Sequence, residues 1–197
     1  MKVSTLGKNL LKEIELPKSY TWLKSDEDIY PYYVGDRGII IGYGHYIGYN
    51  ELSDKSEIAL LKEFGLADAA LDISHAKLPY IVPGSKAISI TRINEILNDD
   101  VKIHEDALNK YFSEYSISVS QQEFEALVIY RFLNNQLGGT IVSLLESNNQ
   151  NNDDWYSAIV GGTKGGSQYS DGWRAREDSV YNLFIEGVYS YQGVTIE

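Results

Sequence analysis

Cysteine is absent from this chain of 197 residues, which excludes disulfide scaffolds, thiol catalysis, cysteine-ligated zinc and iron–sulfur clusters. Long apolar runs are absent too, because no stretch reaches the ~18 consecutive apolar residues typical of a membrane span. The segment Met1–Leu16 alternates apolar residues with Lys and Glu, so it lacks the apolar core of a secretory signal. We therefore expect no membrane insertion and no signal peptide.

Basic residues are scarce: 17 Lys and Arg stand against 28 Asp and Glu, giving a formal net charge of −11. Non-specific nucleic-acid binding needs clustered positive charge, so this balance argues against a nucleic-acid partner. It also disfavours attraction to anionic membranes. Tyrosine is abundant, with 16 residues. Because aromatic ring faces stack on sugars, this composition favours a carbohydrate ligand.

The apolar spacing is helical over most of the chain. Ser4 or Thr5 can cap a first helix that Pro17 ends, and Thr91 opens a long helix. Ser120 and Glu123 form a capping-box pair ahead of another helix, which Asn135 can end in a left-handed conformation. Further helices are expected from Ser53 to Phe64, around residues 141–145 and 155–160, and over Trp173–Glu186.

One short region predicts strands. Between Tyr32 and Ile47, Tyr, Val and Ile surround a turn-like Gly35-Asp36-Arg37-Gly38, which indicates a β-hairpin. Gly42 and Gly44 indicate a bulge or a close backbone approach. The order of helix, hairpin and many helices predicts an α+β fold. We expect a single domain over residues 1–197, mostly helical, with a small β lobe at roughly residues 30–52.

Residues of this hairpin carry a resemblance. The string Gly42-Tyr43-Gly44-His45, after Ile40 and Ile41, resembles the T-I-G-Y-G-H signature of phage-type, T4-like lysozymes, the endolysin muramidases. Residues 9–15 are similar to that family's helix ending in the catalytic Glu, and the resemblance places the acid at Glu15, not Glu13. Similar stretches follow in the family's order, at residues 96–101, 124–132 and 176–189. The resemblance implies a lysozyme-like fold.

The chain also departs from the family pattern. Counting back from His45, the second catalytic position, usually Asp, falls on Val34, and the nearest carboxylate is Asp36. Ile40 replaces the Thr of the signature and cannot hold a water through its side chain. Asp26 and Asp28 are further alternatives for the second carboxylate. These changes affect the water-activating half of the expected site and leave the acid in place.

The chemistry explains why such residues are needed. Glycoside hydrolysis requires a proton for the leaving oxygen and a second carboxylate that orients water or stabilises positive charge. Apolar surroundings raise the pKa of a carboxyl group, so a Glu at an apolar helix end can keep its proton. The resemblance implies an inverting muramidase that cleaves the N-acetylmuramate–N-acetylglucosamine bond of bacterial peptidoglycan, with Glu15 as acid and Asp36 as the second carboxylate.

Other site residues are expected from the same comparison. Tyr32, Tyr43, Tyr46 and Asn135 are candidates for the sugar groove, although tyrosine also suits a half-exposed strand. The resemblance aligns Asp100 with the acidic partner of His45, which implies a structural ion pair. A carboxylate partner raises the pKa of a histidine, and the stabilisation then fades as the pH rises through that value.

Structural explanations remain open for several of these residues. Glu15 can be a solvated helix-end charge, and Asp36 an ordinary turn residue. His75 and His104 share no metal-ligand spacing with His45, so we expect no metal and no cofactor. We interpret the aromatic residues Trp155, Trp173 and Phe184 as core.

Two other function classes remain. One is a lysozyme-fold protein that has lost hydrolysis and binds glycan or a protein partner. The other is an unrelated helical regulator. Nothing in the sequence demands an oligomer, so we expect a monomer. We expect synthesis in a host cytoplasm with release to the cell wall, or carriage in a phage or secretion assembly.

Overall fold

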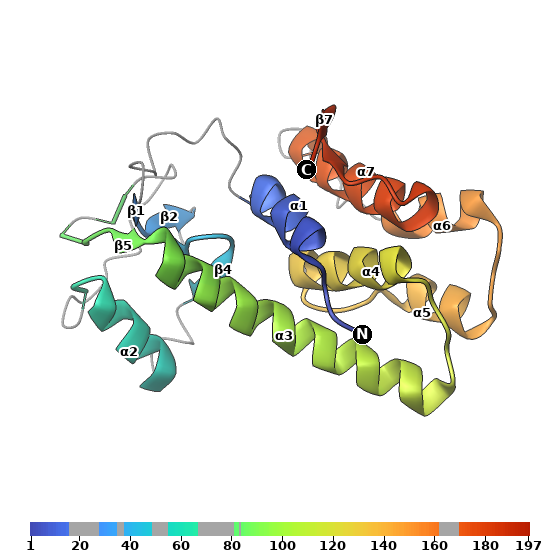
Figure 1. Cartoon of the computed structure of the whole chain (residues 1–197), viewed down its shortest axis with the longest axis horizontal. Helices are drawn as coiled ribbons and strands as arrows, with labels where there is room; N and C mark the ends of the chain where they lie inside the picture. The colour runs from blue at the N-terminus through green and yellow to red at the C-terminus, as the bar shows by residue number, and fades with distance from the viewer. Residues whose placement is uncertain (16–27, 35–37, 49–54, 67–80, 83, 162–169) are drawn as a thin grey trace. The chain divides into compact units, whose positions relative to one another are not determined.

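The computed structural model describes residues 1–15, 28–34, 38–48, 55–66, 81–82, 84–161 and 170–197 (Figure 1). Backbone contacts divide the chain into two compact units. Unit 1 comprises residues 1–14 and 100–197, and unit 2 comprises residues 15–99. The range predicted for a small β lobe, residues 30–52, lies inside unit 2. The mixture of helices and small antiparallel sheets is an α+β architecture, as predicted.

The described part of unit 2 contains a three-stranded antiparallel sheet and a separate two-stranded one. The sequence predicted one hairpin here, and the structure adds strands because Gly42–Gly44 turns the chain back a second time. The two-residue pair between β1 and β5 was not predicted, since two residues show no periodicity. The elements are β1 (Asp28–Ile29), β2 (Tyr32–Val34), β3 (Gly38–Ile41), β4 (His45–Gly48), α2 (Lys55–Glu63) and β5 (Ile88–Ser89).

Glycine makes the tight connection between β3 and β4 possible. Gly42 has φ 57° and Gly44 has φ 94°, a region that side chains disfavour. A Cβ atom on Gly42 would also collide with the side chain of Ile93. The predicted close backbone approach is therefore confirmed. The turn sets the register that pairs Ile41 with His45.

The core of unit 2 lies where the sheet, α2 and the start of the long helix α3 (Ile90–Tyr115) contribute apolar side chains. Its members alternate along β3, whereas the adjacent Tyr32 and Tyr33 of β2 are both buried, and they follow helical spacing along α2 and α3. The fully buried ones include Ile29, Ile39, Ile41, Ile47 and Phe64. This packing fixes the position of the Gly42–Gly44 turn against α3.

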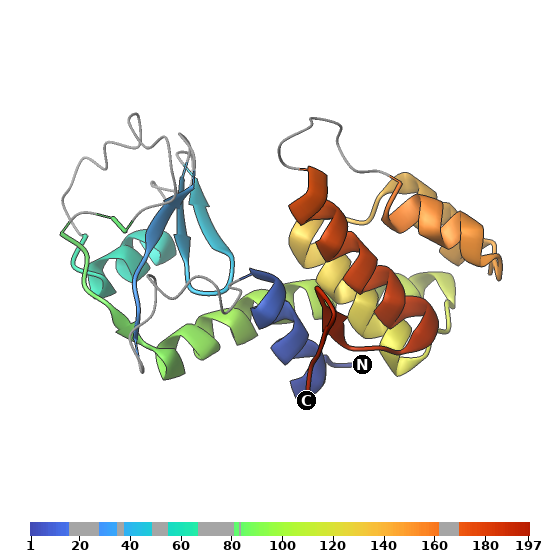
Figure 2. The same ribbon diagram turned by 90° about the horizontal axis from the view of Figure 1, so that it is seen from above.

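The described residues of unit 1 are helical apart from one C-terminal hairpin. Helices α4 (Gln121–Asn134) and α7 (Ser170–Glu186) lie side by side, as Figures 1 and 2 show. Every residue of Phe124–Tyr130 is buried, so α4 is surrounded by other parts of the protein. The remaining elements are α1 (Thr5–Glu15), α5 (Gly139–Glu146), α6 (Asn152–Ile159), β6 (Ser190–Tyr191) and β7 (Val194–Thr195).

Local signals set several helix ends as predicted. The Ser120 side chain accepts from the Glu123 backbone, and the Glu123 side chain accepts from the Ser120 backbone, which confirms the capping box. Asn135 ends α4 with φ 62°, also as predicted. The Ser4 hydroxyl accepts a hydrogen bond from the Gly7 N–H at 3.1 Å and caps α1.

Two expectations in unit 1 were wrong. Trp173 was assigned to the core with Trp155 and Phe184, but it is 38% exposed, whereas the other two are buried. Its ring lies under the guanidinium of Arg176, 5.3 Å from the ring centroid, so it rests on the surface of α7. The helix itself begins at Ser170, three residues before the predicted start near Trp173.

Candidate functional site

Glu15 ends α1 and is 9% exposed. The apolar residues before it, Leu10, Leu11 and Ile14, have no exposed surface, so the amphipathic helix fixes the rotation at which its last residue emerges. Burial and the negative end of a helix dipole both disfavour a charged carboxylate. A fully solvated helix-end charge therefore does not describe Glu15, and its role as an acid stays a prediction.

Two buried carboxylates anchor the start of the same helix, and sequence reasoning missed both. Glu125 is fully buried and accepts hydrogen bonds from the Ser4 N–H and hydroxyl, both at 3.0 Å, and from the Tyr189 hydroxyl at 3.0 Å. Glu105 accepts from the Val3 N–H at 2.6 Å. A Glu within an apolar helical run was the available signal. These contacts fix the origin of the helix that carries Glu15.

The residues expected for the second half of the site belong to the β2–β3–β4 sheet and its neighbourhood. Ile40 is half-buried and pairs with Tyr46 across the sheet. Val34, at the family's second catalytic position, pairs with Gly38 in the backbone register. Asp36, the expected second carboxylate, lies outside the described residues, as does Asp26. The role of Asp36 therefore stays a prediction.

The candidate sugar-binding residues differ in exposure. The ring of Tyr32 is buried in the core of unit 2, and half-buried Tyr43 packs against the same core. Tyr46 is 50% exposed, and its ring covers Gly38, where any Cβ atom would collide with it. Asn135 is exposed at the end of α4. Of the three tyrosines, Tyr46 is the most exposed.

His45 has a carboxylate partner that the sequence did not indicate. Its Nε2 atom lies 3.0 Å from Oε2 of Glu57, joining β4 to α2. Glu57 lies in the first turn of α2, outside the stretches that carry the resemblance. The expected pair of His45 with Asp100 joins residues of the two units and stays a prediction.

Another histidine, His104 on α3, is held neutral in unit 1. Burial lowers the pKa of His104 to about 4, the nearby Arg131 guanidinium also lowers it, and Asp100 raises it. Arg131 Nη1 lies 2.6 Å from His104 Nδ1, so the arginine donates and this nitrogen is unprotonated. Sequence reasoning considered His104 only as a metal ligand and missed this contact.

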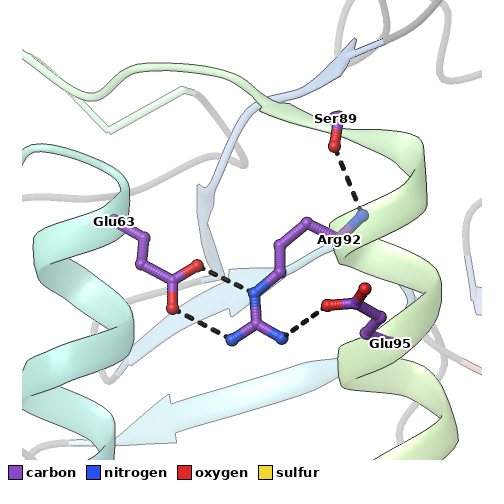
Figure 3. A network of polar contacts seen from close by, with 4 residues as sticks. All are labelled: Glu63, Ser89, Arg92 and Glu95. Carbon is purple, nitrogen blue, oxygen red and sulfur yellow. Dashed lines mark hydrogen bonds and ion pairs between the residues drawn. The ribbon is translucent and has the colours of Figure 1, made fainter.

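An exposed network ties α2 to the start of α3 (Figure 3). Arg92 donates to both carboxylate oxygens of Glu63, at 2.8 and 2.9 Å, and to Glu95 at 3.1 Å, while the Arg92 N–H donates to the Ser89 hydroxyl. The hydrogen bonds from Arg92 hold the pKa of Glu63 below its usual value. These ion pairs therefore have a structural role, because they hold α2 against the start of α3.

The described residues contain no group of three or more His, Cys, Asp or Glu side chains that could hold an ion. No helix in the described part of the chain is long and apolar enough to span a bilayer. Comparison with known protein families, curated proteins and solved structures finds no significant match.

Proposed function

We propose that this protein is a muramidase with a lysozyme-like fold, which hydrolyses the N-acetylmuramate–N-acetylglucosamine bond of bacterial peptidoglycan. The observation that carries the proposal is the buried carboxyl group of Glu15 at the end of an anchored amphipathic helix. The ordered series of lysozyme-like motifs along the chain supports it. The Gly42–Gly44 turn, packed against α3, supports it as well.

In the proposed reaction Glu15 donates its proton to the leaving glycosidic oxygen. Asp36 orients the attacking water or stabilises the positive charge that develops on the sugar ring. Ile40 offers the water no hydrogen bond through its side chain, so the water must be held elsewhere. An inverting outcome requires a separation of about 6.5–9.5 Å between the two carboxyl groups.

A second candidate function is glycan or protein binding without hydrolysis on the same fold. Val34 and Ile40 favour it, because they remove the polar groups that the family pattern places around the water. The Glu at the end of the first helix, where the family pattern places the acid, opposes it. The two functions can be distinguished by one product, because hydrolysis creates new reducing ends and binding does not.

The test is the clearing of purified cell-wall suspensions by the wild type and by Glu15→Gln. The variant keeps the shape of the side chain and removes its acid, so we expect a rate loss of about 10²–10⁴. The matched control is Glu13→Gln, two residues earlier on the same helix. Equal lysis by Glu15→Gln and the wild type would remove Glu15 from the mechanism.

The second carboxylate is tested in the same assay by Asp36→Asn. A general base contributes about 10²–10⁴ to the rate, so we expect a loss in this range. A rate within about tenfold of the wild type would remove Asp36 from the mechanism. We place the enzyme's action at the cell wall, which it reaches from a host cytoplasm or in a phage or secretion assembly.

A further inference from the structure

Residues 1–4 form a strap that side chains of α3 and α4 hold by its backbone. On α3, the Asn109 side chain donates to the Met1 carbonyl at 2.9 Å. One turn earlier on the same helix, Glu105 accepts from the Val3 N–H at 2.6 Å. Glu105 and Val3 are both buried, so this second contact is shielded from solvent. Helix α3 therefore fixes the first and third residues of the strap.

Helix α4 holds the other two residues of the strap. Gln121 donates to the Lys2 carbonyl at 2.7 Å and to a carboxylate oxygen of Glu125 at 2.6 Å. The fully buried Glu125 accepts from both the N–H and the hydroxyl of Ser4, each at 3.0 Å. Each residue of the strap is therefore bonded to a side chain that lies more than 100 positions later in the sequence.

A glycine lets the first turn of α1 lie close to this carboxylate. The Ser4 hydroxyl caps α1 by accepting from the Gly7 N–H at 3.1 Å. A Cβ atom on Gly7 would lie 2.3 Å from Glu125 Oε2 and 2.8 Å from Val3 Cγ1, closer than nonbonded atoms can approach. The Glu125 oxygen cannot move aside without losing the hydroxyl groups of Ser4 and Tyr189, which both donate to it at 3.0 Å.

The strap adds directional contacts to the packing of α1. The buried side chains of Leu10, Leu11 and Ile14 fix which face of the helix points inward, but apolar packing is non-directional. Hydrogen bonds have a defined length and direction, so the strap sets how far along its own axis α1 lies. The 11 residues of α1 form one helix, with a rise of about 1.5 Å per residue, and it carries a displacement at its first turn to Glu15.

We propose that Glu105, Glu125 and Gly7 are positioning residues for Glu15, acting through the strap and α1. The expected effect on the rate rests on the proposed function, in which Glu15 is the acid. A misplacement of about 1 Å, caused by a change far from the chemistry, can cost about 10²-fold in rate. Loosening the strap should therefore lower the turnover number more than it weakens the binding of substrate.

The test measures kcat and KM for the release of reducing ends from solubilised peptidoglycan, per folded molecule. Glu105→Ala leaves the Val3 N–H without its acceptor, so we expect kcat to fall about 10- to 100-fold while KM changes little. Glu105→Gln should keep the wild-type kcat, because its amide oxygen can accept the same hydrogen bond. Ile159→Ala, which leaves a cavity at the buried face of α6, controls for lost stability and should leave kcat unchanged.

Gly7→Ala separates positioning from helix stability. Alanine favours a helix more than glycine does, so the change strengthens α1 while its Cβ atom pushes the first turn away from Glu125. We expect a loss in kcat of the same size as for Glu105→Ala. The exposed Thr5, in the same turn, provides the control, and Thr5→Ala should leave kcat unchanged.

An NMR measurement tests the positioning role independently of hydrolysis. In the ¹⁵N-labelled full chain, the amide signals of Ile14 and Glu15 should move in Glu105→Ala and Gly7→Ala. They should keep their wild-type positions in Glu105→Gln and Thr5→Ala. Unmoved signals, or wild-type kcat, in both Glu105→Ala and Gly7→Ala would overturn the positioning role. Moved signals in a protein that releases no reducing ends would support the positioning of α1 and overturn the muramidase proposal instead.

Discussion

At the scale of single residues, buried carboxylates connect distant segments of unit 1 through hydrogen bonds. Glu125 is fully buried and accepts hydrogen bonds from Ser4, Gln121 and Tyr189, which belong to three separate parts of the chain. Desolvation and the hydrogen bond to Glu125 raise the pKa of Tyr189 to about 12, which keeps its hydroxyl a donor. The carboxylate is a structural junction between α1, α4 and the C-terminal segment.

Removing that junction should destabilise the protein strongly. We expect Glu125→Ala to lower the free energy of unfolding by about 3 kcal/mol, because Ser4 and Tyr189 lose a buried acceptor and a cavity remains. Urea denaturation measures the change. Exposed Glu114 on α3 provides the control, since Glu114→Ala should stay within about 0.5 kcal/mol of the wild type. Equal stability of the two variants would refute the role of Glu125.

His104 gives a pH dependence whose sign follows from its lowered pKa of about 4. The unfolded chain, with a histidine pKa near 6.5, takes up a proton before the folded chain does. The contribution of His104 to the free energy of unfolding is therefore greatest above pH 6.5 and falls as the pH drops towards 4. We expect about 2 kcal/mol of loss, after allowance for the partly exposed ring.

The variant His104→Gln isolates this effect, because its amide oxygen can still accept from Arg131 and it does not titrate. The difference in unfolding free energy between wild type and variant should shrink or change sign between pH 6.5 and 4. A difference that stays constant over this range would show that His104 does not carry the predicted linkage.

At the scale of elements, short-range signals could be predicted from the sequence and tertiary ones could not. The capping box at Ser120 and the left-handed Asn135 were correct, because each depends on residues within one turn. The β1–β5 pair joins Asp28 to Ser89, 61 residues further along the chain, and no local pattern encodes such a pairing.

The candidate site shows the same difference between short-range signals, which the sequence reveals, and tertiary contacts, which it does not. The amphipathic helix that ends at Glu15 could be predicted from its apolar spacing. The choice of Glu15 as the acid came from the resemblance to phage-type lysozymes and stays a prediction. The contacts of His45 with Glu57, and of Glu125 with Ser4 and Tyr189, join distant segments and could not. Trp173 was misplaced because a single aromatic residue on a helix does not reveal which face the fold covers.

The capping box offers a prediction at this scale. We expect Ser120→Ala to lower the free energy of unfolding by about 1 kcal/mol, because the Glu123 N–H loses its side-chain acceptor. Thermal denaturation should show a lower midpoint, and Ser120→Asp should restore most of it, since Asp is also a favourable cap. No loss in Ser120→Ala would mean that tertiary packing alone fixes the start of α4.

At the scale of the whole molecule, charge is the property that matters most for a wall substrate. A protein with a net charge of −11 is repelled by anionic wall polymers, and physiological salt screens this repulsion beyond about 8 Å. We expect wall clearing to accelerate as salt rises from low to physiological concentration. Walls stripped of anionic polymers provide the control and should show a much smaller effect. Faster clearing at low salt on intact walls would contradict the argument.

The most direct measurement of the central claim is the chemical nature of the products released from purified peptidoglycan. The account predicts fragments that end in reducing N-acetylmuramic acid, identified by mass spectrometry after borohydride reduction, from the wild type and Glu13→Gln but not from Glu15→Gln. The absence of new reducing ends with the wild-type protein, or the same ends with Glu15→Gln, would contradict it.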